Sequence, residues 1–168
     1  MRKIRHLILV LAVAALAATV VSTAHAAKQL KPKKKVPIAF VGNYSGQAST
    51  LVNGTTVTIS AKGNGTGKVI GSGALNASGT GDSSQQPCVP FGGTGSITGA
   101  HGTINFSAIP GASGCGDEGG HNFTVKAILK VTSATGKLAG RKGTLRAIGT
   151  YSRDDGTFTV KVTGNLTK

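Results

Sequence analysis

Two cysteines and one short acidic loop hold most of the residue types in this chain that could do chemistry. Cys88 and Cys115 are the only cysteines, and residues 115–121 read CGDEGGH. With His101 added, this loop offers the carboxylate and imidazole groups that bind divalent metals. The spacing matches no ligand pattern of a zinc or calcium site. We therefore predict a solvated acidic loop, no metal site, no cofactor and no catalytic centre.

The first 26 residues have the order of a secretory signal peptide. Basic residues at Arg2, Lys3 and Arg5 precede an apolar run over 7–21, and Ala24 and Ala26 place small residues at a cleavage site. The run is shorter than the roughly 20 residues of a membrane span. We expect cleavage after Ala26 and export to the periplasm or the extracellular space.

Export decides how the cysteines are interpreted. An exported chain meets an oxidising compartment, where paired cysteines form disulfides. The sequence therefore predicts one intramolecular disulfide between Cys88 and Cys115, with a structural role.

The chain is strongly basic, with 19 lysines and arginines against five acids. Removal of the signal peptide leaves 16 basic residues and a net charge of +11. Residues 27–35 form a predicted flexible arm that could bind anionic lipid, wall polymer or nucleic acid. Aromatic residues are few, which argues against sequence-specific recognition of nucleic acid. The arm contains five lysines: Lys28, Lys31, Lys33, Lys34 and Lys35.

From residue 36 onward, apolar and polar residues alternate with a period of two, which is typical of strands. Short links rich in Asn and Gly, such as Asn53-Gly54, join consecutive strands and favour an antiparallel meander. We predict a single all-β domain over 36–168, an eight-stranded antiparallel up-and-down barrel, with a two-sheet sandwich as the alternative. The expected strands cover 38–44, 56–61, 69–77, 91–97, 104–108, 122–131, 144–151 and 157–166.

Two longer loops, over 80–90 and 109–120, contain one cysteine each. In a meander, loops alternate between the two ends of the barrel. These loops follow the third and fifth expected strands, so both belong at the same end, where a disulfide could join them. The Cα atoms must then lie within roughly 7 Å of each other.

The alternation also assigns the inward face. Tyr44 and Tyr151 are the only polar residues that it turns inward within a strand, so we name them as candidate ligand contacts. General acid–base catalysis needs a positioned titratable group, which disfavours an enzyme. Inward glycines either leave a small cavity or mark corners of a tightly filled barrel, and we favour the filled barrel. The other inward residues are apolar: Phe40, Val57, Ile59, Leu75, Phe106, Val125, Leu129, Ala147, Val160 and Val162.

The pattern T-G-x-[IL]-x-G-x-x-G-T-[IL] occurs twice, over 94–104 and 135–145. We interpret it as repeated hairpin geometry, because a strand follows each copy where a phosphate loop would need a helix. Residues 92–102, GGTGSITGAHG, resemble the glycine motif of dirigent proteins and allene oxide cyclases. The resemblance implies an eight-stranded barrel with an internal pocket. Repeats of this kind also resemble those of a group of uncharacterised secreted bacterial proteins.

These observations predict a secreted, non-catalytic barrel that associates with anionic cell-surface material through its basic exterior. The alternative is a barrel that binds a small apolar ligand, or acts on one as dirigent proteins and cyclases do.

Overall fold

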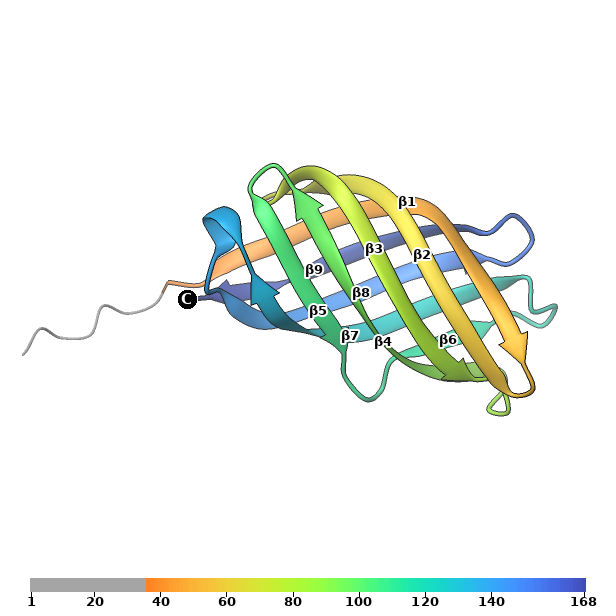
Figure 1. Cartoon of the computed structure of the whole chain (residues 1–168). Helices are drawn as coiled ribbons and strands as arrows, with labels where there is room; N and C mark the ends of the chain where they lie inside the picture. The colour runs from red at the N-terminus through yellow and green to blue at the C-terminus, as the bar shows by residue number, and fades with distance from the viewer. Residues whose placement is uncertain (1–35) are drawn as a thin grey trace, which may run out of the picture. The chain divides into compact units, whose positions relative to one another are not determined.

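A computed structural model describes residues 36–168. The predicted signal peptide (1–26) and basic arm (27–35) lie outside the described residues. The described chain forms nine strands and one short 3₁₀ helix, arranged as a barrel (Figure 1). The elements are β1 (Ile38–Asn53), β2 (Thr56–Gly67), β3 (Gly71–Asp82), β4 (Cys88–Gly99), β5 (Gly102–Ala108), β6 (Ser113–Gly116), β7 (Asn122–Ala134), η1 (Gly136–Leu138), β8 (Lys142–Ser152) and β9 (Thr157–Thr167).

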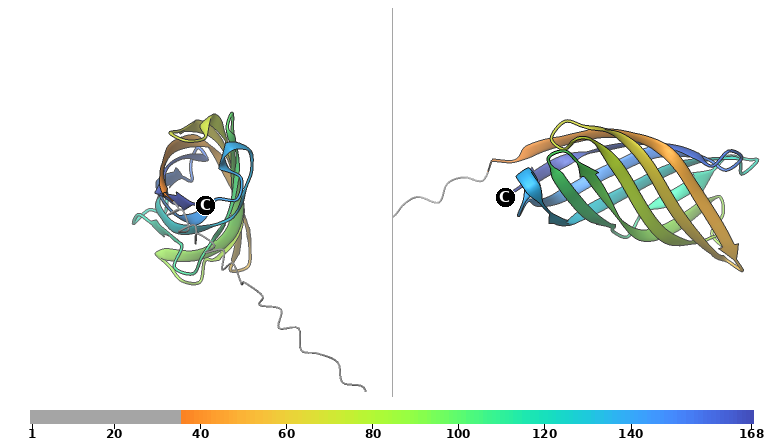
Figure 2. Two further views of the ribbon diagram at one scale, coloured as in Figure 1. Left: turned by 90° about the vertical axis from the view of Figure 1, so that its left-hand side faces the viewer. Right: turned by 45° about the horizontal axis from the view of Figure 1, so that its top comes forward.

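The strands form one closed antiparallel sheet, which confirms the predicted eight-stranded barrel and not the sandwich. The order is β3-β2-β1-β9-β8-β7-β5-β4, and pairing between β3 and β4 closes the ring. Strands β5 and β6 share one position, because both pair with β4 on one side and β7 on the other. Views along and across the barrel show the continuous wall (Figure 2).

The structure has more strand than the sequence analysis predicted. Strand β1 continues nine residues past Tyr44 to Asn53, in full register with β2. Residues 45–53, SGQASTLVN, contain small and polar residues on both faces, which hide the alternation. Strand β6 lies inside the predicted loop 109–120 for the same reason, since its sequence is SGCG.

The two ends of the barrel differ. At the end where β1 begins and β9 finishes, which we call the closed end, Leu138 of η1 and Ile70 of the β2–β3 turn are buried. They join a core that includes Phe40, Leu145 and Leu166. At the opposite end, the open end, lie the β1–β2, β3–β4 and β8–β9 turns and the β6–β7 loop. Among residues 36–168, no helix is long and apolar enough to cross a membrane.

Aromatic rings packed on glycines fill the closed half. Phe106 and Gly95 are direct partners across β5 and β4, and a Cβ at Gly95 would lie 2.6 Å from the Phe106 ring. Tyr44 faces Gly65 across β1 and β2, and a Cβ there would lie 2.6 Å from the Tyr44 ring. Such pairs let a ring cover the bare backbone of the facing strand. The glycines of β2 and β4 therefore make room for the core.

The two copies of the glycine pattern lie side by side at the closed end. The amide of Lys137 donates to the carbonyl of His101, and the amide of Thr135 donates to that of Thr103. The first copy is a hairpin as predicted, whereas the second begins with the 3₁₀ helix η1. Both copies connect neighbouring antiparallel strands, but the second copy does so through η1, so the turn itself is not repeated. The shared feature is burial of its apolar positions: Ile97, Ile104, Leu138 and Leu145.

The predicted disulfide between Cys88 and Cys115 is confirmed. The two cysteines are directly opposed across β4 and β6, with Cα atoms 3.9 Å apart. They thus lie in paired strands, not in the loops that the sequence suggested. The bridge joins the start of β4 to β6 at the open end, as the meander required.

Replacing Gly95 with alanine should destabilise the fold by about 1–3 kcal/mol, the cost of overpacking a filled core. The new methyl group would lie 2.6 Å from both the Asn76 carbonyl oxygen and the Phe106 ring. Gly92→Ala is the matched control on the same strand, because a Cβ at Gly92 has no heavy atom within 4 Å. Urea unfolding should give Gly92→Ala a stability within about 0.5 kcal/mol of the parent. Equal stability of the two variants would contradict the packing described.

Candidate functional site

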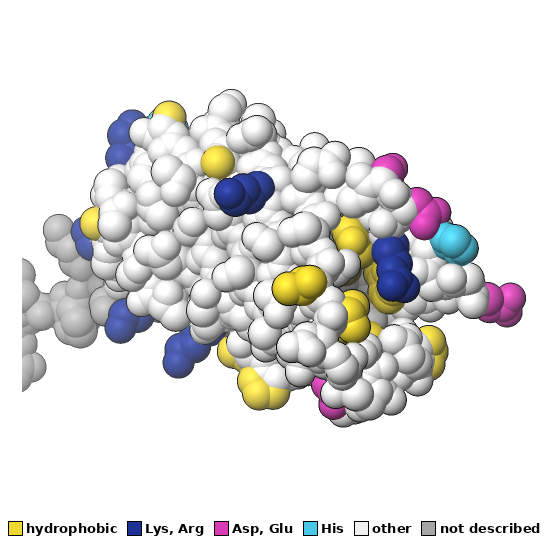
Figure 3. Space-filling view, turned by 45° about the vertical axis from the view of Figure 1, so that its right-hand side comes forward, with side chains coloured by type: hydrophobic (Ala, Val, Ile, Leu, Met, Phe, Trp, Pro, Cys, Tyr) yellow, Lys and Arg dark blue, Asp and Glu magenta, His cyan; other side chains and the backbone are white. Residues whose placement is uncertain are grey.

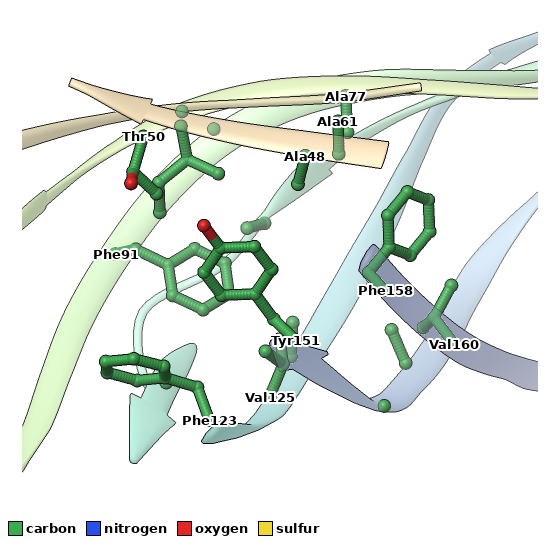
Figure 4. Close-up of a pocket in the computed structure, with 18 of the residues that line it drawn as sticks. Ala48, Thr50, Ala61, Ala77, Phe91, Phe123, Val125, Tyr151, Phe158 and Val160 are labelled. Carbon is green, nitrogen blue, oxygen red and sulfur yellow. The ribbon is translucent and has the colours of Figure 1, made fainter. Parts of the chain in front are cut away.

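The open half of the barrel encloses an apolar cavity of about 490 Å³. Its volume lies in the range of about 300–1,000 Å³ that is typical of small-molecule sites. Figure 4 shows aromatic, valine and alanine side chains around it, contributed by strands from the whole circumference. Figure 3 shows hydrophobic side chains in a hollow of the surface at this end. The preference for a tightly filled barrel is therefore wrong for the open half.

The cavity exists because the inward positions of the open half have small side chains. Ala48, Ala61 and Ala77 form the wall on β1, β2 and β3, and Gly79 and Gly93 line it beside them. The three atoms nearest to a Cβ at either glycine are backbone atoms of the adjoining strand. The rings of Phe106 and Phe158 also line the cavity, from the side of the filled half. The side chains therefore divide the lumen into a filled half and an open half.

Tyr151 is one of the two candidate ligand contacts, and the structure places it in the cavity. Its ring packs against Phe123 on the neighbouring strand, with centroids 6.0 Å apart. In Figure 4 its hydroxyl points into the cavity, on the side of Thr50. Tyr151 can therefore offer one hydrogen-bonding group to a molecule held between apolar walls.

Tyr44, the other candidate, lies elsewhere. It is 2% exposed and belongs to the filled half, where its hydroxyl lies beside Gly42 and Gly67. No residue of the described barrel forms a hydrogen bond with this hydroxyl, and burial raises the pKa of Tyr44 to about 12. Tyr44 does not line the cavity. The structure thus brings one of the two tyrosines to the candidate site.

Two loops of the open end are joined by an ion pair. Nδ1 of His121, in the β6–β7 loop, donates to the carboxylate of Asp154 in the β8–β9 turn at 2.8 Å. The hydrogen bond to Asp154 raises the pKa of His121, and the charge of Asp154 raises it further. In the described part of the chain, the adjoining Arg153 is the one charged residue that lines the cavity. The acidic loop noted in the sequence, which is the β6–β7 loop, is therefore joined to the β8–β9 turn at the open end.

Asp117 organises that loop from within. Its carboxylate accepts hydrogen bonds from the backbone amides of His121 and Asn122 and from the side chain of Asn122. These bonds, with that from the Asn122 side chain foremost, lower the pKa of Asp117 and keep it ionised. His101 and His121 lie at opposite ends of the barrel, so they share no site. Within residues 36–168, no group of three or more metal-ligating side chains comes together.

Sequence analysis found some of the cavity and missed the rest. Of the predicted inward apolar residues, all but Phe40 line it: Val57, Ile59, Leu75, Phe106, Val125, Leu129, Ala147, Val160 and Val162. It missed the wall contributed by the second half of β1, including Thr50 and Val52, because that segment was not assigned to a strand.

The tip of the β1–β2 hairpin is exposed and apolar, with Leu51 at 70% and Val52 at 53%. The predicted polyanion-binding lysines, Lys28, Lys31, Lys33, Lys34 and Lys35, lie outside the described residues.

Comparison with known proteins identifies no relative: the chain matches no family model, no curated protein and no solved structure.

The contact between His121 and Asp154 should appear in a pH titration. A raised pKa means that the pairing stabilises the folded state at pH values below the ordinary histidine pKa of about 6.5. That contribution is lost as the pH rises through the raised pKa of His121. NMR titration of the imidazole should give a pKa above the ordinary value, and Asp154→Asn should lower it. Asp155→Asn is the control, since Asp155 bonds Thr157 instead. A His121 titration unchanged by Asp154→Asn would disprove the contact.

Proposed function

We propose that this protein binds a small, uncharged, largely apolar molecule in the open half of its barrel. The observation that carries the proposal is the apolar cavity of about 490 Å³ that opens at one end of an otherwise filled lumen. Eight-stranded barrels are wide enough to hold one small ligand when their inward side chains are small. Here alanine and glycine supply that space.

The cavity lining favours binding over catalysis. Among the described residues that line it, the ionisable ones are Tyr151 and Arg153, and Arg153 is exposed at the mouth. Acid–base chemistry needs a titratable group held close to the reacting atoms. None of the lining residues within 36–168 offers a carboxylate or an imidazole. A dirigent-like or cyclase-like activity remains the alternative that the motif over 92–102 suggests, and the proposal does not depend on it.

The same lining indicates the kind of ligand. Hydrophobic walls gain free energy in proportion to the apolar area that the ligand buries. A buried charge would meet no partner in the inner part of the cavity, where the lining is uncharged. One polar group, such as a hydroxyl or carbonyl, could bond the Tyr151 hydroxyl. We therefore expect a hydrocarbon or aromatic skeleton with at most one or two oxygen functions.

Filling the cavity should abolish binding without unfolding the barrel. Ala61→Leu adds three carbon atoms to the wall, and the protein should then bind the neutral fluorescent probe N-phenyl-1-naphthylamine at least about tenfold more weakly. Thr58→Leu is the matched control, because residue 58 is exposed on the outer face of the same strand. Near-ultraviolet circular dichroism establishes that both variants are folded.

Probe enhancement equal in the parent and in folded Ala61→Leu would show that the probe binds elsewhere and would refute the proposal. Weaker binding by Thr58→Leu to the same degree would also count against it.

A further inference from the structure

Acidic and basic side chains occupy opposite parts of the barrel. All five acids of the chain lie at the open end, in its turns and loops or at the strand end beside them: Asp82, Asp117, Glu118, Asp154 and Asp155. Of the 11 lysines and arginines in residues 36–168, Arg153 alone lies at that end. The open end thus has a net charge of −4, and the rest of the barrel has +10. Figure 3 shows acidic side chains gathered at the open end, with basic ones mostly elsewhere on the visible face.

The closed end presents positive charge from separate segments of the chain. Lys68 lies in the β2–β3 turn, Lys137 in η1, Lys142 at the start of β8 and Lys168 after β9, and all four are exposed. No Asp or Glu side chain lies at this end, and none of these lysines forms a salt bridge among the described residues. Their charges are available to an anionic partner.

The two ends are far enough apart to act separately. Strands of 11 or 12 residues, at about 3.3 Å per residue and the tilt usual in barrels, separate the ends by roughly 30 Å. The Debye length in physiological salt is about 8 Å. A charged surface that meets the closed end is therefore screened from the acids of the open end.

We propose that the closed end docks on a membrane that contains anionic phospholipids, with the cavity mouth directed away from the bilayer. The lysines come from separate turns and chain ends around the end face of the barrel, which suits an extended anionic surface. Val36, where the described chain enters the barrel at this end, is 75% exposed and can insert among headgroups. The sequence places the lysine-rich stretch 28–35 immediately before it. The proposed docking of the closed end does not rest on the proposal that the cavity binds a ligand.

A membrane fits these features better than a nucleic acid does. Single-stranded nucleic acids are held largely by stacking of bases on aromatic side chains. The seven aromatic residues of the chain are all buried or half-buried in the barrel, and none is exposed. The closed end therefore offers charge and one apolar side chain, without a stacking surface.

The test compares two triple variants that remove the same charge. One replaces Lys68, Lys137 and Lys142 with glutamine at the closed end. The other replaces Lys62, Lys126 and Lys161, which are exposed on the barrel wall midway along their strands. Binding is measured by co-sedimentation with vesicles of phosphatidylcholine, alone or mixed with phosphatidylglycerol. We expect the parent to bind only the mixed vesicles. The closed-end variant should bind them at least about tenfold more weakly, since each lysine near an anionic surface contributes appreciably, and the wall variant less than about threefold more weakly.

Equal weakening by the two triple variants would overturn the assignment of the closed end. Equal binding to neutral vesicles, or tighter binding of soluble polyphosphate or single-stranded DNA than of mixed vesicles, would overturn the choice of a membrane. Binding of N-phenyl-1-naphthylamine, measured in the same variants, keeps this result separate from the proposed ligand site. The closed-end variant should bind that probe as the parent does.

Discussion

The packing of aromatic rings on glycines is the interaction on which the rest of this barrel depends. The lumen of an eight-stranded barrel is only just wide enough for its side chains. Strands β2, β3 and β4 place glycine at many inward positions, so their wall contributes little volume. In the closed half, Tyr44 covers Gly65 and Phe106 covers Gly95. The rings on β1 and β5 fill the space that the glycines of β2 and β4 leave empty.

The cavity forms where small inward side chains leave the lumen unfilled. Toward the open end, Gly79 and Gly93 line the cavity together with Ala48, Ala61 and Ala77. The filled half gives the cavity a rigid floor, and the Cys88–Cys115 bridge fixes the start of β4 beside its mouth. Core and site are therefore two halves of one lumen. The charges follow the same axis, with acids around the mouth and lysines at the closed end.

Much of this fold could be predicted from the sequence, because apolar and polar residues alternate with a period of two in a strand that buries one face. The alternation Phe123, Val125, Ala127, Leu129 of β7 is an example. It failed for 45–53 and for β6, where serine, glycine and threonine occupy both faces. Cavity size could not be predicted, because it depends on which ring reaches which glycine across the barrel. Tyr44 and Tyr151 have the same pattern in sequence, but only Tyr151 turns its hydroxyl to the open half.

Methyl NMR spectra of the protein titrated with N-phenyl-1-naphthylamine test the central claim most directly, because they report which half of the lumen the probe enters. The account predicts saturable shifts of the methyl groups of Ala48, Val125 and Val160, which line the cavity. The methyl groups of Ile70, Leu138 and Leu166, in the filled half, should stay unchanged. Shifts confined to the filled half or to outward residues such as Ile128 and Ile148, or no saturable shift at all, would contradict it.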